Sequence, residues 1–188
     1  MPLSAPPAIE SERLLVRLVV EDDLPGLLKI NGDSEVTKHL PYETWQSLSD
    51  AQAWFQRMAG IHATGTALQF VVARKDSREI LGTCLLFRFD EGSARAELGY
   101  VLGRAHWGRG LMGEALDALI GCAFGTMALR RLEAEVDPRN TASLRLIQRL
   151  GFVKEGLLRH RWVTKGEAKD VEIYGLLGNE WSGIRNGA

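Results

Sequence analysis

The sequence has few of the features that mark a secreted, disulfide-linked or metal-binding protein. It contains 2 cysteines, Cys84 and Cys122, which stand in apolar stretches and not in a Cys-x-x-Cys pair. A chain of 188 residues can bury a core without disulfides, so we expect both thiols to be small buried side chains in a reducing compartment. The 4 histidines (residues 39, 62, 106 and 160) show no metal-ligand spacing, which argues against a metal site.

Long apolar runs and an excess of one charge are also missing. The sequence contains no run of about 18 apolar residues, so we expect no membrane-spanning helix. The first residues, MPLSAPPAIESER, lack the basic start and apolar stretch of a signal peptide. The formal net charge is −1, so neither nucleic acid nor a membrane is expected as a partner. The cytoplasm is the expected location.

Periodic patterns predict one mixed α/β domain over residues 10–182, between flexible tails at 1–9 and 183–188. The second to fourth expected strands would form an antiparallel meander, and the last two would form a hairpin around Lys165 and Gly166. The expected strands are 13–19, 68–73, 80–89, 96–102, 131–136, 152–162 and 169–177, and the expected helices start near 21, 47, 111 and 141.

A glycine pattern follows the fourth expected strand. The stretch WGRGLMGEAL contains Gly-x-Gly-x-x-Gly at Gly108, Gly110 and Gly113. Glycines let backbone N–H groups approach a phosphate closely, and the N-terminus of the next helix adds partial positive charge. The stretch therefore predicts a pyrophosphate site, with a glycine-rich helix start that binds nothing as the alternative.

The same glycine pattern occurs in nicotinamide-binding and flavin-binding domains. There, a strand runs directly into the first glycine, and an acidic residue follows about 20 residues after the pattern. Glu133 fits the acidic position by count. However, residues 103–107 separate the expected strand from Gly108, and an antiparallel meander precedes the loop. A nicotinamide-binding domain is therefore disfavoured.

Several segments, in order, resemble the GCN5-related N-acetyltransferases (GNAT), and within them the RimJ/RimL-like ribosomal-protein N-acetyltransferases. The segments are ERLLVRLVVEDDLPGLLKI, DSEVTKHLP, the helix with Ala53-Trp54-Phe55, AELGYVLGRAHWGRGLMGEAL, EVDPRNTASLRLIQRLGFVKEG and GEAKDVEIYGLL. In that branch the loop commonly begins with tryptophan, as here at Trp107. Met112 stands where a small residue is usual, so its bulk would have to point away from the phosphates.

The resemblance implies an α/β fold with a mixed, mostly antiparallel sheet, splayed between the fourth and fifth strands and flanked by helices on both faces. Acetyl-CoA would enter the gap as co-substrate, and no metal is needed. Its pyrophosphate would meet N–H groups of the glycine loop, and its pantetheine arm would meet the fourth strand and an asparagine. The implied cofactor-binding residues are Tyr100, Val101, Leu102, Gly108, Arg109, Gly110, Leu111, Met112, Gly113 and Asn140. Dimers are frequent in the family, which leaves room for a homodimer.

Direct acetyl transfer to an amine requires a base, stabilisation of the thioester oxygen and, in some enzymes, an acid for the leaving thiolate. Glu97 and Glu135 lie on the strands that flank the gap, and either of them, or neither, could be the base. Many members carry a tyrosine in the helix after the asparagine, but Ile147 takes its place here. Ser143 is then the candidate acid. The alternatives are a serine that only bonds backbone and a thiolate that leaves unassisted.

The expected activity is acetyl transfer to a protein N-terminal α-amine or a small-molecule amine. The N-terminal helices and the last hairpin would line the acceptor pocket, although aromatic residues there could equally belong to the core. The candidates are His39, Tyr42, Trp45, Trp54, His160, Arg161 and Trp162, with Glu43 and Asp50 as acidic groups for a cationic amine.

The stretch from Arg130 to Lys165 is basic, with nine Arg or Lys and four Asp or Glu. Arg139, Arg145 and Arg149 could meet the 3′-phosphate of coenzyme A, or could simply form a solvated basic face. A non-catalytic acyl-CoA-binding protein of the same fold is the alternative function. The presence of both candidate glutamates favours the enzyme.

Overall fold

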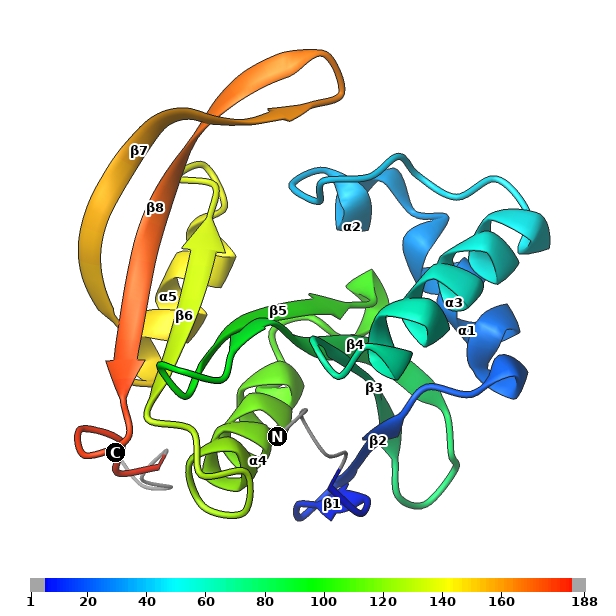
Figure 1. Ribbon diagram of the computed structural model, residues 1–188. Coiled ribbons are helices and arrows are strands. Elements are labelled where there is room, and N and C mark those ends of the chain that lie inside the picture. Colours follow the sequence, from blue (N-terminus) through cyan, green and yellow to red (C-terminus); the bar gives the residue numbers. More distant parts are fainter. Residues whose placement is uncertain (1–5, 184–188) are drawn as a thin grey trace.

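The computed structural model describes residues 6–183, within which eight strands form one continuous sheet (Figure 1). The strand order is β1-β2-β3-β4-β5-β6-β8-β7, and only β5 and β6 are parallel neighbours. The strands are β1 Ile9–Glu10, β2 Leu14–Leu18, β3 Leu68–Arg74, β4 Ile80–Asp90, β5 Arg95–Leu102, β6 Arg131–Val136, β7 Val153–Thr164 and β8 Glu167–Leu177. This is the mixed, mostly antiparallel sheet that the family resemblance implies.

Helices cover both faces of the sheet. They are α1 Leu24–Asn31, α2 Ser34–Thr37, α3 Leu48–Ala63, α4 Leu111–Phe124 and α5 Thr141–Arg149, with 3-10 turns at Glu21–Asp23 and Arg104–His106. Because side chains alternate along a strand, β3 serves two cores. Phe70 and Val72 belong to the apolar cluster that contains α4 and α5, whereas Val71 belongs to the cluster that contains α1 and α3.

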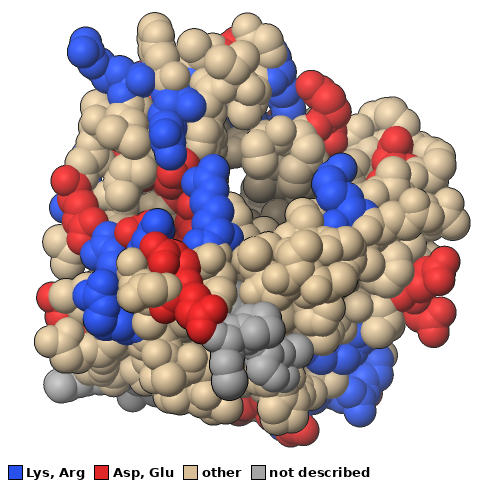
Figure 2. All heavy atoms as spheres, viewed as in Figure 1, with Lys and Arg blue, Asp and Glu red and all other residues tan. Residues whose placement is uncertain are grey.

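β5 and β6 are paired only over their first residues. Arg95 pairs with Arg131, and the last pair is Glu97 with Glu133. Beyond this pair β5 stays with β4, and β6 continues alongside β8, so the sheet opens. Figure 2 shows this face of the molecule hollowed between the β7–β8 hairpin and the side that carries α3. The splay expected between the fourth and fifth predicted strands is therefore confirmed.

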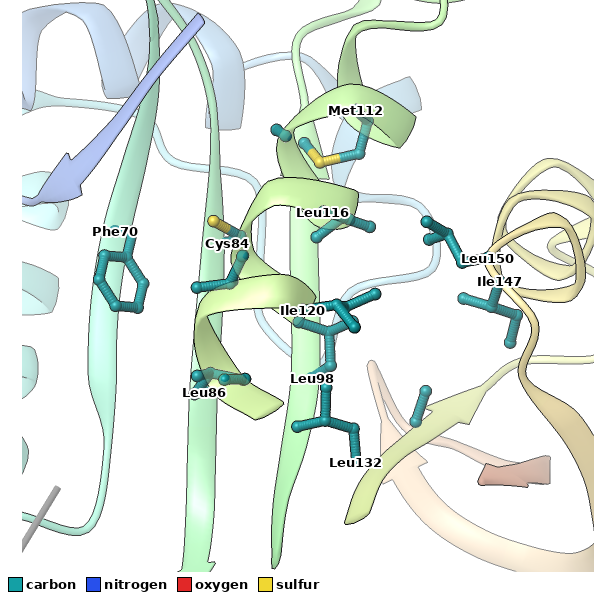
Figure 3. Close-up of a cluster of buried hydrophobic side chains, with 14 of the residues drawn as sticks. Phe70, Cys84, Leu86, Leu98, Met112, Leu116, Ile120, Leu132, Ile147 and Leu150 are labelled. Carbon is teal, nitrogen blue, oxygen red and sulfur yellow. The ribbon is translucent and has the colours of Figure 1, made fainter. Parts of the chain in front are cut away.

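The core on the α4 side holds the two halves of the opened sheet together. Figure 3 shows Met112, Leu116 and Ile120 on α4, beside Leu98 of β5 and Ile147 of α5. All these side chains are buried. Burying a large aliphatic side chain stabilises the fold by about 1.5–3 kcal/mol. This layer therefore keeps β5 and α5 in place although β5 and β6 have separated.

Boundaries predicted from periodicity agree closely with the observed elements, but the short elements β1, α2 and Arg104–His106 are not predicted. β1 corrects part of the expected N-terminal tail, because Ile9 pairs with Val16. Residues 1–5 and 184–188 lie outside the described part of the chain, so the tails stay a prediction. These three elements are shorter than or barely as long as one helical turn or two strand repeats, so the sequence shows no periodic pattern of apolar residues there.

One of the two cysteines is buried in the core. Cys84 and Cys122 are both free; Cys84 is buried as expected, whereas Cys122 is only half-buried. Cys122 lies outside the stripe of α4 residues that packs on the sheet. Among residues 6–183, no helix is long and apolar enough to cross a membrane.

Candidate active site

Two clefts meet at the gap between β5 and β6. The first, of about 600 Å³, is lined by the loop from Gly108 to Gly113 and by the start of α5, and we call it the glycine-loop cleft. The second, of about 590 Å³, is lined by Glu97, Glu135 and Trp162, and we call it the carboxylate cleft. The residues common to both clefts are His39, Leu40, Tyr100, Val101, Asn140 and Ser143. Because the clefts share this wall, groups bound in each can meet.

The glycine loop places a helix N-terminus at the first cleft. Gly110 is the N-cap of α4 with φ 72°, in the left-handed region that favours glycine. Gly108 has the same φ, and a Cβ built there would meet nothing within 4 Å. The first N–H groups of α4 have no partner within the helix, and its dipole attracts an anion. The donor set and the open space fit a pyrophosphate group.

Nine of the ten predicted cofactor residues line the glycine-loop cleft, and Arg109 does not. The Arg109 carbonyl accepts a hydrogen bond at 3.3 Å from Nη1 of Arg13, the residue just before β2. Met112 also lines this cleft, but it is only 4% exposed and its side chain belongs to the apolar core, near Leu116 (Figure 3).

The Asn-x-x-Ser pattern has a structural role at the start of α5. Asn140 is the N-cap, and its Oδ1 accepts a hydrogen bond from the Ser143 N–H at 3.1 Å. The Ser143 hydroxyl lies 2.6 Å from the Tyr100 hydroxyl, so it bonds a side chain of β5. Burial raises the pKa of Tyr100 to about 12, against the effect of its hydrogen bond with Ser143. Ile147 is buried in the core and offers no hydroxyl.

The two candidate bases lie close together in the carboxylate cleft. The side chains of Glu97 and Glu135 are each 8% exposed. Arg88 Nη1 lies between them, 2.7 Å from Glu97 Oε2 and 3.1 Å from Glu135 Oε1. Trp162 Nε1 also donates to Glu135, at 2.8 Å. A single nitrogen is therefore held between carboxylates from both sides of the splay.

Glu97 titrates near neutral pH. Its pKa is raised to about 7, mainly by burial, while the guanidinium of Arg88 lowers it and the negative charge of Glu135 raises it. A carboxylate with this pKa can take up a proton at physiological pH, which a solvated glutamate cannot do efficiently.

Arg88 is a site residue that the sequence does not reveal. The pairing of β4 with β5 shifts register between Phe87 and Asp90, and Arg88 has φ 50° within this bulge. Non-glycine residues rarely adopt this conformation, and such strain gathers at functional sites. The bulge turns the Arg88 side chain toward the gap. No residue pattern in the sequence signals it.

The structure sorts the acceptor-side candidates. Five of these candidates line the carboxylate cleft, namely His39, Tyr42, Trp54, Arg161 and Trp162. Trp45 is instead buried against Trp54, and His160 is exposed and does not line the cleft. Glu43 and Asp50 also lie outside it. Asp50 instead accepts hydrogen bonds from the N–H groups of Gln46 and Ser47, and with Ser47 it forms a capping box at the start of α3.

The segment around α2 roofs the gap. His39 Nδ1 lies 3.2 Å from Asp137 Oδ2, beyond the end of β6. Lys165, at the tip of the β7–β8 hairpin, donates to the Thr37 carbonyl at 2.9 Å. These contacts join the N-terminal helices to the far half of the sheet. The only local signal for α2 is the N-cap Asp33, which accepts from the Glu35 N–H at 3.0 Å.

The splayed sheet, the anion-binding helix start and the titratable carboxylate define a class of protein. Together these features are typical of a group-transfer enzyme with a pyrophosphate-bearing co-substrate. The glycine loop lies between the parallel strands β5 and β6, but every other neighbouring pair in the sheet is antiparallel. A nicotinamide-binding domain requires several parallel strands that alternate with helices, so the sheet excludes it.

Comparison with known proteins identifies the class further. The family model of the acetyltransferase (GNAT) domain matches residues 13–153, so the chain belongs to the GNAT acetyltransferase family. It is 38% identical over 173 residues to the "Uncharacterized N-acetyltransferase p20" of Bacillus licheniformis, covering 92% of this chain and 97% of that protein. It is 31% identical over 183 residues to the ribosomal protein uS5-alanine N-acetyltransferase of Escherichia coli (strain K12), covering 93% and 92%.

A solved structure shows the same fold. The ribosomal L7/L12 alpha-N-protein acetyltransferase RimL, in complex with coenzyme A, superposes with a TM-score of 0.82 at 22% identity, over 91% of this chain and 98% of that one. The chain is an N-acetyltransferase, and GNAT enzymes use acetyl-CoA. A non-catalytic protein of this fold is not favoured, since the relatives are acetyltransferases.

Proposed function

We propose that this enzyme transfers the acetyl group of acetyl-CoA directly to a primary amine, with Glu97 as the general base. The observation that carries this assignment is the position of Glu97. It is the last residue of β5 paired with β6, it is buried, and burial brings its pKa to about 7. A base with a pKa near the working pH combines the correct protonation state with sufficient driving force for proton transfer.

The acceptor amine would take the place that Arg88 Nη1 occupies, between Glu97 and Glu135. There Glu97 would remove a proton from the ammonium. Glu135, which Arg161 and Trp162 hold by hydrogen bonds, would orient the amine. Buried carboxylates favour a cation strongly because water screens them poorly.

The co-substrate would bind on the other side of the gap and supply the activated acetyl thioester. The N–H groups from Gly108 to Gly113 would bind the pyrophosphate, and the free edge of β5 from Tyr100 to Leu102 would pair with amides of the pantetheine arm. That edge has no strand partner on the β6 side after Glu97. Asn140, which caps α5, borders the same cleft.

The acceptor class and the setting are proposals as well. A relative named for alanine acetylation of ribosomal protein uS5 supports a protein N-terminus as acceptor, and a small-molecule amine is the second candidate. We infer a cytoplasmic enzyme that needs no nucleic acid, membrane or metal, and the homodimer for which the family resemblance leaves room stays a prediction.

Calorimetric titration with acetyl-CoA, with NAD as control ligand, tests the co-substrate. Arg145 and Arg149 line the glycine-loop cleft and form no ion pair with another described residue. We expect Arg145→Gln/Arg149→Gln to weaken coenzyme A binding about tenfold, because each arginine can pair with the 3′-phosphate. Binding of 3′-dephospho-coenzyme A should change little. Acetyl-CoA that fails to bind the wild type would overturn the proposed function.

The Tyr100–Ser143 hydroxyl pair is the proposed proton donor to the leaving thiolate. We expect Ser143→Ala and Tyr100→Phe each to lower kcat about tenfold, and the double variant to be no worse, because the pair acts as one unit. The measurement is thiol release at saturating substrates. Ser49→Ala, an exposed serine in the first turn of α3 that lines neither cleft, is the control. Additive losses, or no loss, would show that the thiolate leaves without this pair.

A further inference from the structure

The carboxylate cleft has acidic groups at its base and basic groups at its mouth. Glu97 and Glu135 are only 8% exposed. Three arginines line the same cleft, namely Arg57 of α3, Arg88 and Arg161. The side chains of Arg88 and Arg161 are 52% and 47% exposed. In Figure 2, basic side chains stand on both sides of the hollow.

The acidic groups of the cleft do not neutralise its mouth. Asp137 also lines the cleft, but it forms an ion pair with Arg139 at 2.8 Å and contacts His39. Arg161 reaches Glu135 only at 3.4 Å, and Arg57 has no ion pair with another residue of the described chain. Arg57 and Arg161 lie on opposite sides of the opening, on α3 and β7, and both are solvated. Positive groups therefore stand on two sides of the opening, above a buried acidic base, and we call them the rim.

We propose that the acceptor is a primary amine carried on an anionic body, such as a peptide N-terminus followed by acidic residues, and that Arg57 and Arg161 select it. This inference rests on the proposed function. An ammonium would reach the buried carboxylates while the acidic groups behind it pair with the rim. A polyamine or a basic peptide would place its additional positive charges next to the arginines. Repulsion between like charges would then weaken its binding.

Three amidated peptides that differ only in charge test the selection. They are Ala-Asp-Glu-Ala, Ala-Asn-Gln-Ala and Ala-Lys-Lys-Ala, with spermidine as a polycation and thiol release from acetyl-CoA as the assay. We expect kcat/KM to be about tenfold higher for the acidic than for the neutral peptide, because the two solvated ion pairs together are worth about 1.4 kcal/mol. We expect kcat/KM for the basic peptide and for spermidine to be lower than for the neutral peptide. Raising KCl should narrow the difference, because both arginines are solvated.

Arg57→Gln and Arg161→Gln are expected to lower the ratio of kcat/KM for acidic over neutral peptide, each by about threefold. The matched control is Arg78→Gln, an exposed arginine in the turn before β4 that does not line the cleft. A preference for spermidine or the basic peptide would overturn the inference, as would an acidic-to-neutral ratio that neither variant changes. In those cases acetyl-CoA binding and amine acetylation would still uphold the proposed function, whose failure is seen separately in the calorimetry.

Discussion

Glu97→Gln is expected to lower kcat/KM by about 10²–10³-fold at pH 8, the range that a general base contributes. Glutamine has nearly the same shape and still accepts from Arg88, which lies 2.7 Å from Glu97. The change therefore removes the proton acceptor with little loss of packing. The measurement is initial-rate kinetics of thiol release from acetyl-CoA with an amidated peptide acceptor.

The pH dependence distinguishes a base from a structural carboxylate. Glu97 has a pKa of about 7, so the active carboxylate form is lost as pH falls through 7. Dividing wild-type kcat/KM by that of Glu97→Gln at each pH cancels the ionisation of the acceptor amine. We expect this ratio to be constant above about pH 8 and to fall about tenfold per pH unit below about pH 6. A ratio that does not change with pH would exclude Glu97 as the base.

Two controls distinguish loss of the base from loss of the fold. They are the thermal stability of Glu97→Gln and the activity of Glu133→Gln, a variant of a neighbouring carboxylate. The raised pKa of Glu97 means that its charged form is less favourable in the folded than in the unfolded protein. This loss of stability sets in above the ordinary pKa of 4.5 and is complete above about 7. Glu97→Gln should therefore unfold at no lower temperature than the wild type at pH 8. Glu133→Gln, whose carboxylate pairs with Arg95 at 2.8 Å outside the carboxylate cleft, should keep its activity within about threefold.

Among the variants named here, Gly82→Ala is expected to lower the free energy of unfolding the most. Gly82 lies inside β4, paired with Leu102 of β5. A Cβ at this position would overlap the Val101 carbonyl oxygen and lie 3.1 Å from the Leu102 Cα, and backbone atoms cannot rotate away as a side chain can. We expect the free energy of unfolding to fall by about 3 kcal/mol and the Tm by about 6–12 °C. Differential scanning calorimetry measures both.

The same substitution should also disturb the co-substrate site, because Val101 and Leu102 form the free edge of β5. Acetyl-CoA affinity is expected to fall about tenfold in the protein that remains folded. Gly60→Ala is the matched control, since a Cβ at this exposed position of α3 meets nothing within 4 Å. It should stabilise the protein by up to about 1 kcal/mol. If Gly82→Ala left Tm unchanged, the close contact between β4 and β5 would be wrong.

Much of the architecture is predictable from the sequence, because strands and helices of ordinary length carry their own periodicity. β6 is found at its predicted bounds, Arg131–Val136, and α4 begins where the apolar stripe after the glycine loop begins. The glycine loop is predictable for a similar reason. Its left-handed residues and the helix start lie within a few positions of each other, so the letters alone indicate the geometry. The resemblance to acetyltransferases supplied the ligand, which local geometry does not specify.

The chemistry of the site depends on contacts between residues far apart in the chain. Arg88 and Glu135 are 47 positions apart, and Tyr100 and Ser143 are 43 apart, yet each pair forms a hydrogen bond. The sequence offered Glu97 and Glu135 as equal candidates because it contains no information on burial. Folding places Glu97 at the last pair before the splay, and desolvation there raises its pKa.

The sequence by itself thus determined the order of the strands and helices, the glycine loop and the set of candidate carboxylates, since these depend on residue type and on near neighbours. Only the tertiary structure decided which carboxylate titrates near neutral pH, that the bulge in β4 turns Arg88 into the gap, and that arginines from α3 and β7 surround one opening. The physical reason is that burial and charge pairing are properties of the assembled site, and the assembly brings these residues together only when the sheet has formed and opened between β5 and β6.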